Sequence, residues 1–205
     1  MLRIVLSTGN EHKVREISDV LNEFDVEVIS KNSLGLNHVD VVEDGHTLEE
    51  NAIKKARELW QHTGGIVIAD DTGLFVKYLK GDPGVHSSRY AGDLANDSDN
   101  NALLLKNMKN VEEKDRQAFF KTVIVIIDRN EKIHLSEGIC CGQIGFEPKG
   151  EHGFGYDSLF IVDGIGKTFA QMSNEEKNIH SHRGKALRKL EKIFPEILYE
   201  TDYNK

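Results

Sequence analysis

The sequence lacks the features of disulfide-bonded and membrane proteins. Its two cysteines, Cys140 and Cys141, are neighbours in the chain and are poorly placed to bridge each other. No apolar run approaches the ~20 residues that span a membrane. Met1-Leu2-Arg3 leads directly into a strand-like run, so we expect no signal peptide. These absences predict a disulfide-free protein in a reducing, cytoplasmic setting.

The sequence also has fewer basic than acidic residues. The chain has 26 Lys and Arg residues against 34 Asp and Glu residues, a net charge of −8. A nucleic-acid-binding surface needs a basic footprint, so we expect no nucleic-acid partner. If the ligand carries phosphates, local Lys and Arg residues and a metal ion must neutralise them. The 205 residues show no repeat or low-complexity linker, which fits one domain or two lobes sharing a core.

Apolar patterning predicts alternating strands and helices, and hence an α/β fold. Strands are expected at residues 2–7, 26–30, 66–69, 118–127 and 132–141. The last two are joined by a turn over 128–131, so the hairpin makes a mixed sheet with flanking helices. Helices are expected after the first strand, after Thr47, over 97–109 and after Gly184, with the ordered chain ending near Pro195 and fraying over 201–205.

Two helix starts carry a capping-box pattern, in which the third helical residue also bonds back to the cap. These are Thr47 with Glu50 and Ser173 with Glu176. In the helix over 97–109, the residues expected to face the core are Ala102, Leu103, Leu105 and Met108.

The most informative stretch runs from Gly65 to Val76, where Asp70 and Asp71 stand between two apolar runs. Buried carboxylates need partners or a metal ion. Successive side chains of an extended strand point to opposite faces, so at most one of the two is expected to face a given cleft. Alternatively, the pair forms an Asx turn that ends the strand and is closed by Gly73.

Three further stretches suit an anionic, aromatic ligand. Residues 8–13 read as a strand, a glycine turn and a helix start with Lys13 in its first turn, which is either an anion site or a plain connection. Residues 150–160 interleave glycines with Phe154 and Tyr156, as suits a flat ring or a simple hairpin loop. His182 and Arg183 begin a helix as possible donors to carbonyl oxygens or phosphates.

Taken together, these stretches resemble the inosine triphosphate pyrophosphatases, also called XTP/dITP diphosphatases. The motifs that carry the resemblance span nearly the whole chain: TGNEHK (8–13), EENAIKKA (49–56), ADDTGL (69–74), PGVHSSRYAG (83–92), GFGYDSLF (153–160) and EEKNIHSHRGKAL (175–187). Six blocks in register are far more specific than any one alone.

The resemblance implies an elongated α/β fold, one domain over residues 1–205 with two lobes and a central substrate cleft, usually as a homodimer. It implies Mg²⁺-dependent hydrolysis of dITP, ITP and XTP to the monophosphate and pyrophosphate. By position, the resemblance implies that Asp71 would be the proton acceptor and a metal ligand, and that Glu43 would be a second metal ligand. The implied substrate-binding residues are Thr8, Gly9, Asn10, Glu11, His12, Lys13, Thr72, Phe154, Gly155, Tyr156, Asp157, Lys177, His182 and Arg183.

The chain departs from the family pattern in three places: Ser158 stands where Pro is usual, Thr72 where Ser is usual, and Ser88 where Ala is usual. Ser158 could loosen the loop expected to hold the base. The rival readings are a Maf-type pyrophosphatase, a nucleotide sensor without turnover and a phosphotransferase. The HSHRG and GFGYD motifs argue against the first, and the lack of a P-loop or kinase motif against the last.

Overall fold

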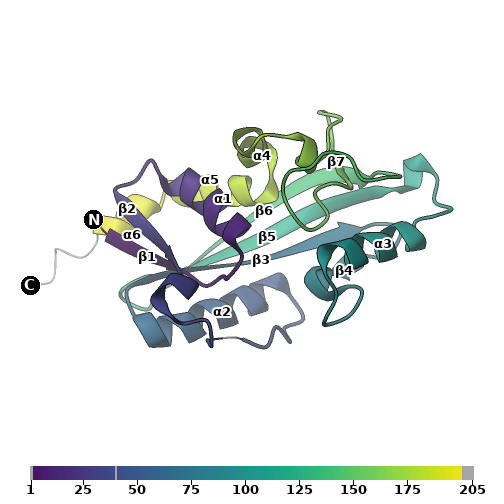
Figure 1. Cartoon of the computed structure of the whole chain (residues 1–205). Helices are drawn as coiled ribbons and strands as arrows, with labels where there is room; N and C mark the ends of the chain where they lie inside the picture. Colours follow the sequence, from purple (N-terminus) through teal and green to yellow (C-terminus); the bar gives the residue numbers. More distant parts are fainter. Residues whose placement is uncertain (1, 40, 200–205) are drawn as a thin grey trace, which may run out of the picture. The chain divides into compact units, whose positions relative to one another are not determined.

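The computed structural model describes residues 2–39 and 41–199. Within these residues, seven strands form one sheet in the order β2-β1-β3-β5-β6-β7, with β4 paired to β3 (Figure 1). The strands are β1 (Leu2–Leu6), β2 (Val26–Ser30), β3 (Ile66–Val76), β4 (Pro83–Gly84), β5 (Gln117–Ile127), β6 (Ile133–Ile144) and β7 (Phe160–Val162). The helices are α1 (Glu11–Leu21), α2 (Leu48–Thr63), α3 (Asp97–Asn107), α4 (Asn174–His180), α5 (His182–Glu191) and α6 (Phe194–Tyr199). In the described part of the chain, no helix combines the length and apolarity that a membrane crossing requires.

The chain folds into two compact units, which are described separately. Unit 1 comprises residues 1–71, 122–138 and 183–205, and unit 2 comprises residues 72–121 and 139–182. Strands β3, β5 and β6 contribute residues to both units. The prediction of one domain with two lobes around a substrate cleft stays a prediction.

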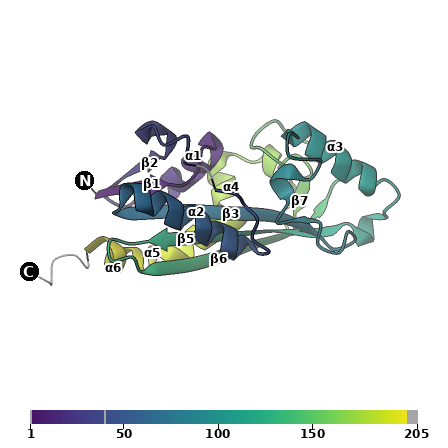
Figure 2. The same ribbon diagram turned by 90° about the horizontal axis from the view of Figure 1, so that it is seen from below.

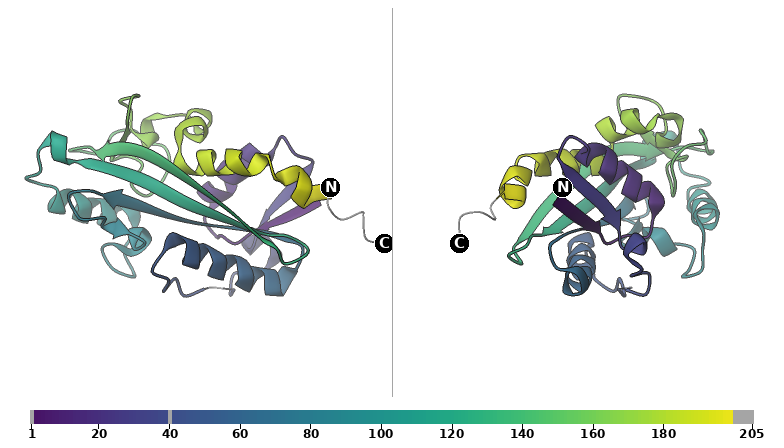
Figure 3. Two further views of the ribbon diagram at one scale, coloured as in Figure 1. Left: turned by 180° about the vertical axis from the view of Figure 1, so that it is seen from behind. Right: turned by 60° about the vertical axis from the view of Figure 1, so that its left-hand side comes forward.

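In unit 1, strand alternation assigns side chains to two helical layers. β1 pairs in parallel with β2 and with β3, so Ile4 lies beside Ile66. Helices α1, α5 and α6 cover one face and α2 covers the other (Figures 1, 2 and 3). The core on the α1 face is formed by Ile4, Leu6, Ile17, Leu21, Ile66, Ile68, Ile124, Ile126, Ala186, Leu187, Leu190, Phe194 and Ile197. Since Ile66 and Ile68 belong to this face, Val67 and Ala69 face α2.

Unit 2 has its own apolar core, built from the other ends of β3, β5 and β6 together with α3 and β7. The core includes Leu74, Val76, Leu104, Met108, Ala118, Phe120, Cys140, Ile144, Tyr156, Phe160, Phe169 and Met172. The intervening positions Phe119 and Ile139 are 36% and 42% exposed. Unit 2 therefore buries one face of these strands more completely than the other. Both cysteines are free thiols.

The mixed sheet with flanking helices is confirmed: β1, β2 and β3 run parallel, while β4 and β7 pair antiparallel with their neighbours. The Asx turn considered for Asp70 and Asp71 is wrong, because β3 continues through both residues to Val76. Antiparallel pairing of Leu74 and Phe75 with β4 keeps this part of the chain extended. Gly73 fits here because a Cβ on it would lie 2.5 Å from the Gly84 carbonyl oxygen.

Three local predictions need correction. In α3, Leu104 is buried and Ala102 is exposed, because four successive apolar residues run around the helix and leave its core face unspecified. Thr47 does accept from the Glu50 amide at 3.1 Å, but the Glu50 carboxylate accepts from the His46 amide at 2.7 Å rather than closing the predicted box. Likewise, Ser173 accepts from the Glu176 amide, whereas the Glu176 side chain pairs with Lys167.

The ordered chain does not end near Pro195. Helix α6 spans Phe194–Tyr199, because Phe194 and Ile197 are buried in the core of unit 1. The predicted fraying over residues 201–205 lies outside the described residues.

Candidate active site

The candidate site is built around Asp70 and Asp71 of β3. Both side chains are buried, at 2% and 5% exposure. Because they are neighbours in a strand, Asp70 points to the α1 face of unit 1 and Asp71 to the α2 face. Their contacts follow this division, so two adjacent, chemically identical residues belong to different clusters.

On the α2 face, Asp71 contacts two residues of one helix. Asn51 and Lys55 are four residues apart in α2 and therefore lie on the same side of it. The Lys55 ammonium is 2.7 Å from Asp71 Oδ1, and the Asn51 amide donates to Asp71 Oδ2 at 3.3 Å. Lys55 also lies 3.2 Å from Glu43 Oε1, and Asn51 Oδ1 accepts from the Gly45 amide at 2.8 Å. The loop that carries Glu43 is thus tied to Asp71 through α2.

The electrostatics of this cluster favour a basic carboxylate. Burial raises the pKa of Asp71, the Lys55 ammonium opposes that shift, and the Glu43 carboxylate adds to it, leaving the pKa above its ordinary value. Burial alone would lower the pKa of Lys55, but Asp71 and Glu43 raise it above its ordinary value. A carboxylate with a raised pKa beside a fixed cation is suited to accept a proton from a bound water molecule.

On the α1 face, Asp70 joins α1 to α5. Asp70 Oδ2 lies 2.9 Å from Arg183 Nη2 and 3.1 Å from Lys13 Nζ. Arg183 is 1% exposed and pairs with Glu16 as well. Burial would raise the pKa of Asp70, but Lys13 and Arg183 hold it well below its ordinary value. Asp70 is therefore a permanent anion that fixes two cations.

Lys13 stands at the start of α1, in the predicted phosphate-binding stretch. Asn10 caps the helix: its side-chain oxygen accepts from the amides of His12 at 2.9 Å and Lys13 at 3.4 Å. Thr8 Oγ1 in turn accepts from the Asn10 amide at 3.1 Å. Burial lowers the pKa of Lys13, although Asp70 opposes the shift. The stretch from Thr8 to Lys13 is thus a self-capped turn with one half-buried ammonium.

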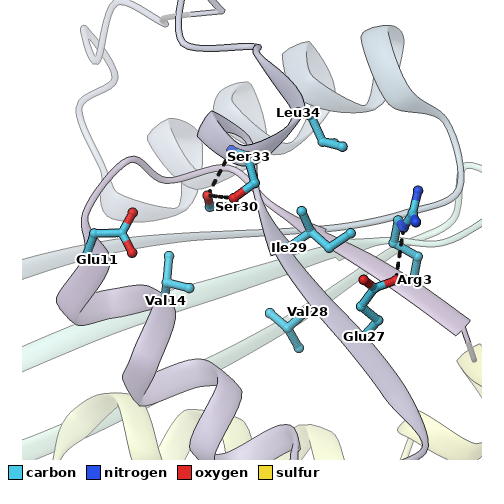
Figure 4. Close-up of a pocket in the computed structure, with 9 residues that line it drawn as sticks. All are labelled: Arg3, Glu11, Val14, Glu27, Val28, Ile29, Ser30, Ser33 and Leu34. Carbon is cyan, nitrogen blue, oxygen red and sulfur yellow. Dashed lines mark hydrogen bonds and ion pairs between the residues drawn. The ribbon is translucent and has the colours of Figure 1, made fainter.

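A cavity of about 500 Å³ lies in unit 1 beside the start of α1 and strand β2 (Figure 4). Of the predicted substrate-binding residues, its lining includes Glu11. Arg3 in its wall pairs with Glu27, and Ser30 shares a hydrogen bond with Ser33. Neither aspartate of the β3 pair lines this cavity, so it does not mark the centre of the candidate site.

Unit 2 gathers a second group of predicted residues. The Lys177 ammonium lies 2.6 Å from Asp157 Oδ2 and 4.8 Å from the centre of the Phe154 ring. Asp157 Oδ2 also accepts from the Phe154 amide at 2.9 Å. The His182 ring stacks on Phe120, with 4.7 Å between ring centroids. This arrangement of rings and one ammonium is chemically suited to an aromatic ligand.

The structure thus places the predicted residues in three groups. Glu43 and Asp71 meet at Lys55, while Lys13 and Arg183 meet at Asp70; Phe154, Asp157 and Lys177 meet in unit 2. Thr72 follows Asp71 in β3 and is half-buried. The sequence reasoning assigned no role to Glu16, Asn51 or Lys55. Their signal was helical spacing: Glu16 lies three residues after Lys13, and Asn51 lies four before Lys55.

The residues around Asp71 fit a divalent cation in their donor chemistry. Glu43 and Asp71 both contact the Lys55 ammonium, so their oxygens already converge on one cation. Carboxylate oxygen is the ligand that Mg²⁺ prefers, and Mg²⁺ usually binds through one or two carboxylates, with waters and substrate phosphates completing its shell. No cluster of three or more Asp, Glu, His or Cys residues suited to a metal occurs in the chain as described. Glu43 and Asp71 therefore fit an ion shared with a ligand.

The fold and the site define an α/β protein whose central strand buries carboxylates against lysine and arginine side chains. Two solved structures share this architecture. A HAM1 protein from Coxiella burnetii has a TM-score of 0.84 and 37% sequence identity, and the match covers 96% of this chain and 100% of that one. The Ham1 protein of Staphylococcus aureus has a TM-score of 0.82 and 36% sequence identity, and the match covers 95% of this chain and 98% of that one. The sequence is also 50% identical to a dITP/XTP pyrophosphatase of Caldanaerobacter subterraneus over 98% of this chain and all of that protein.

The sequence model of the Ham1 family matches residues 4–193, and the chain belongs to this family. The resemblance to the XTP/dITP diphosphatases that the motifs predicted is thereby confirmed.

Proposed function

We propose that this protein is a nucleoside-triphosphate diphosphatase that hydrolyses dITP, ITP and XTP to the monophosphate and pyrophosphate. The proposal includes dependence on Mg²⁺, a homodimeric assembly and a cytoplasmic role in removing deaminated purine nucleotides. Its support is the family membership, the 50% identity to the dITP/XTP pyrophosphatase of Caldanaerobacter subterraneus and the chemistry of the three groups of residues.

The observation that carries the proposal is the environment of Asp71. Its Oδ1 is held by Lys55 and its Oδ2 by Asn51, so the carboxylate has a fixed orientation. The raised pKa makes Asp71 a stronger base than an ordinary aspartate. In the proposed step, water attacks the α-phosphorus, its proton passes to Asp71, and the bond to the bridging oxygen breaks to release pyrophosphate.

Binding of the triphosphate needs positive charge in a chain whose net charge is −8. Lys13 supplies an ammonium whose position is fixed by Asp70, which in turn is fixed by Arg183. Mg²⁺ bound by Glu43 and Asp71 would supply further charge neutralisation and lower the pKa of a bound water molecule. In this proposal the two aspartates have different roles: Asp70 holds the phosphate-binding Lys13, and Asp71 accepts the proton.

Recognition of the base is proposed to use the residues of unit 2. Hypoxanthine and xanthine carry a 6-oxo acceptor where adenine carries an amino donor. A donor such as His182 favours the former and leaves adenine unpaired, which costs on the order of 1–3 kcal/mol. The Phe154 ring and the Lys177 ammonium next to it suit the flat face of a purine.

The test is product analysis with dITP, ITP, XTP, GTP and ATP at mildly alkaline pH. We expect pyrophosphate and monophosphate, formed fast from the first three and slowly from the last two. Removal of divalent ions with EDTA is expected to stop turnover, and added Mg²⁺ to restore it. Release of orthophosphate would contradict attack at the α-phosphorus, and tight binding without any product would favour the nucleotide sensor instead.

The Asp71→Asn variant tests the assigned proton acceptor. Asn keeps the shape and can still accept from Asn51, but it cannot take a proton from water. We expect kcat to fall by about 10²–10⁴-fold while ITP binding and the far-UV circular dichroism spectrum are retained. The matched control is Asp44→Asn, since Asp44 is an exposed partner of Lys54 outside this cluster. A variant with the rate of the native protein would remove Asp71 from the mechanism.

A further inference from the structure

Helix α3 holds the backbone of the loop that carries Phe154. Both polar backbone groups of Gly155 are bound by side chains of this helix. The Gly155 amide donates to Asp97 Oδ2 at 2.6 Å, and its carbonyl oxygen accepts from Asn101 Nδ2 at 2.9 Å. Asp97 and Asn101 are four residues apart and hence lie on one side of α3 (labelled in Figures 1 and 2).

The residues on either side of Gly155 are held as well, and all of them belong to unit 2. The Tyr156 hydroxyl donates to the Ser87 carbonyl oxygen at 2.9 Å, and Tyr156 is 4% exposed. The Phe154 amide and the Lys177 ammonium both contact Asp157 Oδ2. The α3 clamp, meaning Asp97 and Asn101, is therefore the part that fixes the peptide between Phe154 and Tyr156.

The environment of the Asn101 side chain indicates that this residue serves a function besides stabilising the fold. Within the described residues, its Oδ1 is buried and has no hydrogen-bond partner. A buried acceptor without a donor destabilises a fold, and such violations are concentrated at functional positions. The contact that Asn101 gains in exchange is the one to the Gly155 carbonyl oxygen.

The sequence supplies an independent reason for a clamp at this position. Residue 158 is a serine, so no proline ring restricts the backbone directly after Asp157. Gly155 has a φ of +59°, a conformation that glycine adopts freely but does not enforce. The two hydrogen bonds from α3 to Gly155 therefore restrict the loop at a point where its own residues leave it free.

We infer that Asp97 and Asn101 are positioning residues that set the base loop, residues 153–157, and thereby determine discrimination among purine bases. The inference rests on the proposed function, in which Phe154 and its neighbours hold the base. Hydrogen bonds weaken steeply as their geometry departs from the optimum, so a loop that shifts relative to its ligand loses selectivity before it loses all affinity.

The test measures kcat and KM for ITP and GTP, and the inhibition constant of inorganic tripolyphosphate, which has no base. For Asp97→Ala and for Asn101→Leu, we expect KM for ITP to rise about tenfold and the preference for ITP over GTP to fall about tenfold, as the loss of one hydrogen bond implies. kcat for ITP and the tripolyphosphate constant should stay within about twofold.

Two further variants separate positioning from general stability. Asp97→Asn keeps an acceptor for the Gly155 amide and is expected to restore most of the selectivity that Asp97→Ala loses. Asn107→Leu is the matched control, because Asn107 lies on the same helix but donates to the Tyr90 hydroxyl. If Asn101→Leu does not fold, the comparison of Asp97→Ala with Asp97→Asn tests the inference instead. Unchanged selectivity in Asp97→Ala, or equal loss in Asp97→Asn, would overturn the inference.

Failure of the proposed function has a different signature, since the unmodified protein would then release no pyrophosphate. In that case, amide hydrogen exchange of the segment 153–157 tests whether Asp97 and Asn101 fix this loop. Asp97→Ala should speed exchange there while Asn107→Leu leaves it unchanged, and equal exchange in both variants would overturn the clamp.

Discussion

The stability of unit 1 should depend strongly on the single carboxylate of Asp70. Asp70 Oδ2 contacts Arg183 at 2.9 and 3.3 Å and Lys13 at 3.1 Å, with Asp70 only 2% exposed. Asp70→Asn keeps the volume but leaves these buried cations without their shared anion. Loss of one partner from a buried pair costs about 3–5 kcal/mol. For a chain of this length, that lowers the melting temperature by about 6–20 °C.

The assay is urea unfolding followed by circular dichroism, with the midpoint expected to fall on the order of 1–2 M. Asp44→Asn is the control, because the partner of Asp44, Lys54, is exposed like Asp44 itself. We expect the control to leave the midpoint unchanged. Equal midpoints for Asp70→Asn and the unmodified protein would refute the reasoning, because they would mean that the buried cations do not need this carboxylate.

The pH dependence of stability tests the role of Asp70 independently. Lys13 and Arg183 hold the pKa of Asp70 below its ordinary value of 3.8, against the effect of burial. A lowered pKa means that the stabilisation is fully present above the unfolded-state value and is lost as the pH falls toward the folded-state value. The difference in stability between the unmodified protein and Asp70→Asn should therefore narrow below about pH 4. A difference that widens on acidification would contradict the assigned charge state.

Two further predictions concern the other cluster and the core of unit 2. Burial raises the pKa of Asp71 and Lys55 opposes it, so Lys55→Met should move the acid limb of the kcat/KM profile to higher pH; a limb that coincides with that of the unmodified protein would exclude Asp71 as the titrating base. Arg116 is 2% exposed and donates to the carbonyl oxygens of Met108, Ile144 and Gly145. Arg116→Met removes this donor from all three carbonyl oxygens and should destabilise the protein by at least about 3 kcal/mol in urea unfolding, whereas a loss under 1 kcal/mol would show that water replaces the guanidinium.

Periodicity was sufficient to predict most strands of the fold. The runs at Leu2–Leu6 and Val26–Ser30 are apolar or alternate, and both are strands. Helix α3 shows the limit, since the successive apolar residues Ala102 to Leu105 point in all directions around a helix. Only the packing of α3 in unit 2 selects Leu104 for the core. Helix α6 was missed because its short sequence gains stability from burial of Phe194 rather than from its own propensity.

The candidate site was predictable in part for a similar reason. Strand alternation predicts that Asp70 and Asp71 diverge, but it does not say which helix each will meet. That depends on α1 and α5 covering one face of the sheet and α2 the other, which is a tertiary property. Helical spacing alone does not distinguish a buried polar pair from a solvated one, so the sequence does not single out Lys55 and Asn51 within residues 49–56.

The adjacency of the two aspartates has a consequence for changes in chain length. Removing one residue between Ile66 and Ala69 would place Asp71 where Asp70 now lies and Thr72 where Asp71 lies. The Lys13 and Arg183 pairs would keep an anion, but the α2 face would lose its carboxylate. Adding one residue would do the reverse, since Asp70 would take the place of Asp71 and Ala69 that of Asp70. The four preceding residues are all apolar and buried, but the same shift would turn Leu74 and Val76 away from the core of unit 2. Insertions and deletions in β3 are therefore expected to disturb folding as well as turnover.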